Sequence, residues 1–147
     1  MKPLFILLTV LSSILSTASF AADGKVSREV LESFNNTFAN AKEVDWTISE
    51  TFYKAQFALD GQYISAFYDC EGKLMAITRN ISSRQLPLTL QTSLRKEFNN
   101  YWITDLFEVA NDEGTSYYIT LESADAKMVL KSKNNASWTT FQKTKKV

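Results

Sequence analysis

The residue types that carry most enzyme chemistry are scarce in this chain. Its 147 residues include no histidine, which excludes Ser-His-Asp and Cys-His nucleophilic catalysis as well as histidine-based zinc sites. A phosphate-binding loop requires closely spaced glycines. The four glycines instead stand alone, at Gly24, Gly61, Gly72 and Gly114. Most families of hydrolases, nucleotide-binding enzymes and metalloenzymes are therefore poor matches.

Carboxylates are the remaining catalytic groups, and the chain has 16 of them. Two paired carboxylates could serve a glycosidase, but no spacing here favours one pair over another. The sequence "DCEG" (69–72) places two acidic residues beside a glycine, without the alternating oxygen ligands of an EF-hand calcium loop. This segment indicates a hairpin turn. We predict no catalytic, metal or cofactor site and no enzymatic activity.

Cys70 is the only cysteine, so no disulfide can form within the chain. The thiol is either free or bridges two chains. The 16 basic residues balance the 16 acidic ones, which gives no overall field that would attract nucleic acid or an anionic membrane. The local basic run "KTKK" (143–146) is predicted to be a frayed, solvated tail.

The N-terminus has the pattern of a cleavable export signal. Lys2 precedes the apolar run "PLFILLTVLSSIL", and "STASFAA" places small residues before a cleavage site after Ala21. The apolar run is short for a bilayer span and is interrupted by Ser and Thr. We therefore predict a signal peptide over residues 1–21, a periplasmic or secreted protein, and no stable membrane insertion after cleavage.

Two apolar stripes with a spacing of four residues recur 60 residues apart. Side chains at this spacing share one face of a helix, so residues 26–38 and 86–98 are predicted to form amphipathic helices. The positions of the two stripes are Val26, Val30, Phe34, Phe38 and Leu86, Leu90, Leu94, Phe98.

Strand patterns follow each helix. Residues 53–69 read as two strands joined by a turn at Asp60-Gly61, and similar alternation recurs about 64 residues later. Residues 43–49 are predicted to be the first strand; its counterpart falls within 103–109, where either Leu106 or Phe107 matches Trp46. Hairpin-length links favour an antiparallel sheet. The prediction is an α+β fold: one domain over 22–147, made of two repeats (about 24–82 and 84–144), with helices packed on one sheet face.

A surface for a partner is predicted from the alternation in these strands. The sheet face opposite the two predicted helices has no cover. It is predicted to carry Tyr63, Phe67, Met75 and Ile77, with Asp60 at a hairpin tip. An uncovered sheet face with several large apolar side chains is a candidate contact surface. The alternative is that these are single exposed aromatics of an ordinary strand.

Several landmarks together resemble the PepSY-like family of small periplasmic proteins. The resemblance covers essentially all of the chain after residue 21. Its landmarks are the export signal, the helix stripe, Trp46, Y-x-A-x-F (53–57), the DG turn, A-x-Y-D (66–69), a glycine turn, Leu86-Pro87 and Y-x-I-x-L (117–121). One departure is Ser27, where such sequences often carry proline.

The resemblance implies a β-lactamase-inhibitor-protein-like fold and a non-enzymatic role. Relatives in this wider class bind proteins, either restraining a secreted hydrolase or acting as protease propeptides. The leading hypothesis is therefore an exported protein that docks on another envelope or secreted protein, such as a hydrolase, through the open sheet face. A periplasmic small-ligand sensor or carrier is the alternative, and a homodimer through the same face is compatible with both.

Overall fold

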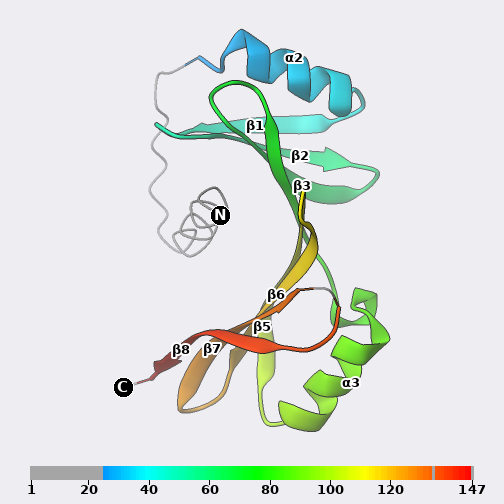
Figure 1. Ribbon diagram of the computed structural model, residues 1–147, viewed down its shortest axis with the longest axis vertical. Coiled ribbons are helices and arrows are strands. Elements are labelled where there is room, and N and C mark those ends of the chain that lie inside the picture. Colours follow the sequence, from blue (N-terminus) through cyan, green and yellow to red (C-terminus); the bar gives the residue numbers. More distant parts are fainter. Residues whose placement is uncertain (1–24, 134, 147) are drawn as a thin grey trace.

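The described part of the chain forms one antiparallel sheet of eight strands whose spatial order follows the chain order. The computed structural model describes residues 25–133 and 135–146, so the predicted signal peptide (1–21) lies outside the described residues. A helix precedes each set of four strands (Figure 1). The elements are α2 (Arg28–Thr37), β1 (Lys42–Ile48), β2 (Tyr53–Leu59), β3 (Gln62–Tyr68), β4 (Leu74–Asn80), the 3-10 turn η2 (Ser83–Gln85), α3 (Leu88–Glu97), β5 (Trp102–Asn111), β6 (Gly114–Glu122), β7 (Ala126–Lys133) and β8 (Thr139–Lys145).

Both predicted helices are confirmed, and they end in the same way. The hydroxyl of Ser27 caps α2 by accepting a hydrogen bond from the N–H of Val30 at 3.4 Å. At the other end, the N–H of Phe38 donates to the carbonyl of Phe34 at 2.8 Å. In α3 the N–H of Phe98 donates to the carbonyl of Leu94 at 3.0 Å. None of the helices in the described ranges is long and apolar enough to cross a membrane.

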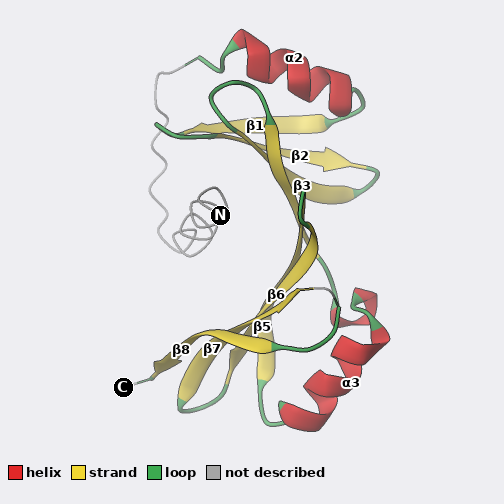
Figure 2. Ribbon diagram, viewed as in Figure 1, coloured by secondary structure: helices red, strands yellow, loops and turns green. Residues whose placement is uncertain are grey.

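The sheet is strongly bent, and α2 and α3 both lie on its outer side (Figure 2). We call this the outer face and the helix-free side the inner face. Strand pairing shows that the two halves share the same outer face, because cross-strand partners project to one side of a sheet. The register connects one line of partners across the middle of the sheet: Phe57, Ile64, Arg79, Glu108 and Tyr117.

Each helix covers its own apolar cluster on the outer face. Under α2 the buried members are Val30, Phe34, Phe38, Ala55, Phe57, Ala66 and Tyr68. Under α3 they are Leu86, Leu90, Leu94, Leu106, Tyr117, Ile119, Leu121, Met128 and Leu130. Between them, the guanidinium Nε of Arg79 pairs with Glu108 at 2.9 Å on the outer side of β4 and β5. The two helix-covered clusters therefore draw on different halves of the chain.

A third cluster lies on the inner face and draws on both halves. Its buried members are Phe52, Phe67, Ala76, Val109 and Tyr118, with Met75, Phe107 and Val129 packed around them. The stacked rings of Phe107 and Tyr118 have centroids 5.3 Å apart. Inside a bend, side chains from neighbouring strands converge, which lets them bury one another without a covering helix. This inner cluster joins the halves of the sheet.

The register settles the position that the sequence left open in β5. Leu106 pairs with Ile119 and is buried under α3, whereas Phe107 pairs with Tyr118 and lies on the inner face. Trp46 pairs with Ala55 in the cluster under α2. Leu106 is therefore the counterpart of Trp46.

The prediction of a frayed C-terminal tail is wrong. Residues Thr139–Lys145 form strand β8, which pairs with β7 through partners such as Met128 and Lys143. The N–H of Lys146 donates to the carbonyl of Asp125 at 2.9 Å. Backbone pairing to β7 holds this segment, and the concentration of lysines in the sequence gave no sign of it.

The phenol of Tyr68 is an unsatisfied polar group in the core. Tyr68 is fully buried under α2 and its hydroxyl has no hydrogen-bond partner among the described residues. A buried, unpaired hydroxyl costs stability. We therefore expect Tyr68→Phe to raise the free energy of unfolding at pH 7 by about 1 kcal/mol, measured by urea denaturation.

The same variant should change the response to alkali. Burial raises the pKa of Tyr68 to about 12, from an ordinary value of 10.0. Because the buried phenol resists ionisation, deprotonation above pH 10 favours the unfolded state, and the free energy of unfolding falls as the pH rises from 10 to 12. The wild type should lose about 2–3 kcal/mol more than Tyr68→Phe over this interval. Equal losses would contradict the burial of the phenol.

Candidate functional site

The inner face is the candidate site, and it has a buried floor between two exposed arms. The inner cluster forms the floor. One arm consists of the inner side of β1, β2 and the start of β3; the other consists of the start of β5, the end of β6, and β7 with β8 (Figure 1). Exposed side chains on the inner face are therefore concentrated on the arms.

Two of the predicted contact residues lie exposed on the first arm. Tyr63 is 65% exposed, and its hydroxyl donates a hydrogen bond to Glu43 at 2.9 Å. The hydrogen bond to this carboxylate raises the pKa of Tyr63. Asp60 is exposed at the β2–β3 turn, where it and Gly61 both have positive φ angles (48° and 78°). This is the two-residue turn that "DG" predicts.

The prediction that Phe67 is an exposed anchor is wrong. Phe67 does lie on the inner face, because it pairs with Lys54 and Ala76, but it is only 1% exposed. The ring of Phe52, from the loop before β2, lies 6.1 Å away. The bend of the sheet and this loop bury Phe67, and neither can be read from strand alternation.

The prediction that Ile77 lies on the inner face is also wrong, whereas Met75 does lie there. The pairing of β3 with β4 shifts between Phe67 and Tyr68, so that Tyr68 pairs with Leu74 and Phe67 with Ala76. The extra residue is Met75, which packs against the inner cluster. Such a bulge reverses the alternation on one side of it. As a result, Ile77 packs against the cluster under α2.

Charged groups border the floor on the first arm. Lys54 lies opposite Phe67 on the neighbouring strand and is partly buried. Burial lowers the pKa of Lys54, and the negative charge of Asp45 offsets part of this shift. Asp45 and Gln56 are paired neighbours on the same side of the sheet. This arm can therefore offer hydrogen bonds and charges of both signs.

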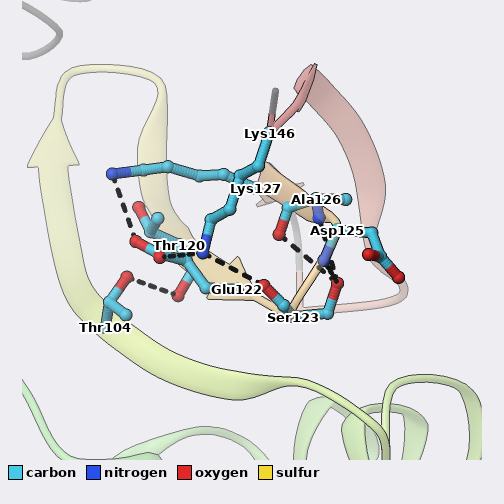
Figure 3. Close-up of polar contacts among 8 residues, drawn as sticks. All are labelled: Thr104, Thr120, Glu122, Ser123, Asp125, Ala126, Lys127 and Lys146. Carbon is cyan, nitrogen blue, oxygen red and sulfur yellow. Dashed lines mark hydrogen bonds and ion pairs between the residues drawn. The ribbon is translucent and has the colours of Figure 1, made fainter.

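A lysine–glutamate network organises the second arm (Figure 3). Glu122 forms ion pairs with Lys146 at 2.8 Å and with Lys127 at 3.3 Å. These two cations hold the pKa of Glu122 below its ordinary value. The ammonium of Lys146 also donates to the carbonyl of Ser123 at 3.0 Å. In addition, it lies 5.3 Å from the ring centroid of Trp102, a cation–π contact.

Sequence reasoning missed several aromatic residues of this face, including Phe52 and Trp102. Phe52 belongs to a loop, so no alternation marks it as part of the floor. Trp102 is 51% exposed and pairs with Glu122 at the first position of β5. Its large ring at a strand start, directly after the helix and turn, is the signal that could have found it.

Two hollows lie elsewhere, beside η2 and the start of β5. The first, of about 210 Å³, includes Leu94, Phe98 and Ile103 in its wall. The second, of about 330 Å³, includes Ile103 and Asp105. In residues 25–133 and 135–146, no group of three cysteine or acidic side chains is placed to hold a metal ion. Cys70 is exposed and forms no disulfide within the described residues.

Comparison with solved structures shows the fold. The chain is similar to a BLIP-like protein from Bacteroides fragilis, with a TM-score of 0.71, 17% identity and coverage of 84% of this chain and 89% of that one. It is also similar to a Bacteroides eggerthii protein described as periplasmic, with a TM-score of 0.72 and 12% identity, over 83% of this chain and 90% of that one. A DUF2874 family protein from Bacteroides ovatus is similar with a TM-score of 0.73 and 16% identity, over 83% of this chain and 89% of that one. No protein-family model matches the chain, and no curated protein matches it either.

Proposed function

We propose that this protein is an exported, non-enzymatic binding protein whose inner face docks on another envelope or secreted protein. The BLIP-like fold supports a binding role of this kind. The similarity of this chain to a protein described as periplasmic supports a periplasmic location. The observation that carries the proposal is the arrangement of the inner face, where a buried floor separates two arms that carry exposed aromatic and charged side chains.

The arms supply the contacts in this proposal. Tyr63 on one arm and Trp102 on the other are both more than half exposed, and tyrosine and tryptophan are the residue types most often responsible for binding energy at interfaces. The concave shape of the face favours a partner with a convex surface, such as a loop or rim around the active site of a hydrolase. Restraint of a secreted hydrolase is therefore the specific role we propose.

We also propose that residues 22–147 form one domain built from two copies of a helix-and-four-strand unit, as in the PepSY-like family. Equivalent positions have equivalent burial in the two halves, and this supports a duplication. Buried pairs separated by 60 residues are Val30 with Leu90 and Phe34 with Leu94; pairs separated by 64 are Ala55 with Ile119, Phe57 with Leu121 and Ala66 with Leu130.

The proposal predicts a loss of partner binding when both exposed aromatics are removed. Tyr63→Ala with Trp102→Ala should weaken binding to the partner by about tenfold or more, because each ring would otherwise be buried in the interface. Their exposure in the free protein means that stability should change little. The measurement is capture from the envelope fraction of the source organism, followed by titration calorimetry with the purified partner.

A matched control removes two exposed apolar residues from the helices. Leu31 and Leu88 are 38% and 78% exposed, so Leu31→Ala with Leu88→Ala deletes apolar surface without touching the inner face. We expect this variant to bind the partner normally. Equal loss of binding in both double variants would contradict docking through the inner face. A small molecule retained in native mass spectrometry, with no protein captured, would favour the carrier alternative.

A further inference from the structure

The last two strands carry an excess of positive charge in a chain that is neutral overall. Residues 126–147 contain six lysines and no acidic residue. Glu122 pairs with two of them, Lys127 and Lys146, and Glu113 pairs with Lys133 at 2.9 Å. Two carboxylates therefore offset only part of the charge.

Two of these lysines project from the edge of the sheet. Lys143 and Lys145 lie two residues apart on β8, on the same side as their partners Met128 and Ala126. Neither forms an ion pair with any of the described residues. Every residue of β8 is exposed, and Phe141, packed edge-on against Tyr118, remains 44% exposed.

Among the described residues, no strand pairs with the edge of β8 that points away from β7. β8 is the last strand in the sheet order and pairs with β7 on one side. A strand edge of this kind can accept an extended peptide, which forms main-chain hydrogen bonds and places alternate side chains on each face. Lysines on an edge also discourage unwanted pairing. Lysines discourage the pairing of a negatively charged strand least, because opposite charges attract.

We propose that the β8 edge binds an extended acidic segment of another protein by strand addition. Acidic residues at alternate positions of the added strand would face Lys143 and Lys145, at the cross-strand distance that favours opposite charges. The positions between them would face the opposite side, where an apolar side chain can contact Phe141. The β8 edge borders the second arm of the inner face, but Lys143 and Lys145 project to the outer side with Met128 and Ala126. The proposal therefore does not depend on docking through the inner face.

Two other occupants fit less well. A second copy of this chain would offer β1, the other edge, but a bulge interrupts β1 and Glu43 there has a positive φ of 53°. A flat anionic membrane would meet lysines on only one side of the sheet. The unpaired lysines point to both sides, because Lys131 lies on the inner face over the ring of Tyr118.

The test uses a fluorescent peptide of alternating glutamate and valine, Ac-Thr-Glu-Val-Glu-Val-Glu-Thr, and the purified full chain at low salt. Fluorescence anisotropy should show saturable binding. Lys143→Gln with Lys145→Gln should weaken it about tenfold, as expected for two exposed ion pairs. The control Lys42→Gln with Lys96→Gln makes the same change of charge on exposed lysines elsewhere and should leave binding unchanged.

A second peptide separates strand addition from simple charge attraction. N-methylation at alternate residues removes backbone donors but keeps every carboxylate, so this peptide should not bind. Equal binding of the methylated peptide would overturn the proposal, as would equal binding of a version with lysine in place of glutamate. Binding to phosphatidylglycerol vesicles without binding to the peptide would identify a membrane surface instead. Self-association that Lys143→Gln with Lys145→Gln abolishes would identify a second copy instead.

Discussion

Replacing Phe67 with alanine is expected to lower the free energy of unfolding by about 3–5 kcal/mol, the usual cost of deleting a buried phenylalanine ring. Phe67 is 1% exposed and packs in the cluster that contains Phe52, Val109 and Tyr118. Because these neighbours belong to β5, β6 and a loop held by hairpin pairing, they cannot easily collapse into the space left behind. Urea unfolding followed by circular dichroism measures the change.

Tyr63→Ala is the matched control for this prediction. Tyr63 lies on the same strand and the same inner face, but it is 65% exposed. Its removal costs one exposed hydrogen bond to Glu43, so we expect a change in stability close to the error of the measurement. If both variants lost equally little stability, the floor of the inner face would be open, and Phe67 would be available to a partner after all.

The distinction between floor and arms determines which residues a partner can contact. The two helix-covered clusters share no residue, whereas the inner cluster contains members of both halves. Phe67 therefore helps to hold the arms in a fixed relation, and truncating it would disturb binding indirectly. Variants of Tyr63 and Trp102 test contact itself, because these side chains contribute little to the fold.

Local patterns were sufficient to predict most of the secondary structure. The apolar stripes at Val30, Phe34, Leu90 and Leu94 mark the buried faces of both helices, since a spacing of four matches the helical period. The Asp60-Gly61 turn fixes the β2–β3 register without a bulge. The eight-stranded antiparallel sheet follows from short links between strands.

The inner face could not be predicted to the same degree, for two physical reasons. A bulge at Met75 breaks the alternation, and a sequence with apolar residues at both Met75 and Ile77 does not show which of them is the extra one. The bend of the sheet is a property of all strands together, so the burial of Phe67 and Tyr118 has no local signature. The lysines at 143–146 likewise hid the continuation of β8 to Lys145, because edge strands tolerate charge.

Replacing Gly72 with alanine is expected to lower the free energy of unfolding by about 2–4 kcal/mol, from two separate costs. Gly72 has a φ of +87° in the β3–β4 turn, a conformation that disfavours any residue with a Cβ. That Cβ would also lie 2.9 Å from both the carbonyl carbon and the carbonyl oxygen of Glu29, in the first turn of α2. Thermal and urea unfolding of the variant measure the sum.

Gly61→Ala separates the two costs. Gly61 has a similar φ of +78° in the β2–β3 turn, but nothing lies within 4 Å of the position that a Cβ would take there, so only the backbone cost of about 1 kcal/mol applies. At Gly72 the contact is with backbone, which can yield only if α2 shifts. The next residue, Val30, is fully buried, so such a shift would disturb the core. Equal destabilisation by the two variants would therefore mean that the β3–β4 turn does not pack against α2.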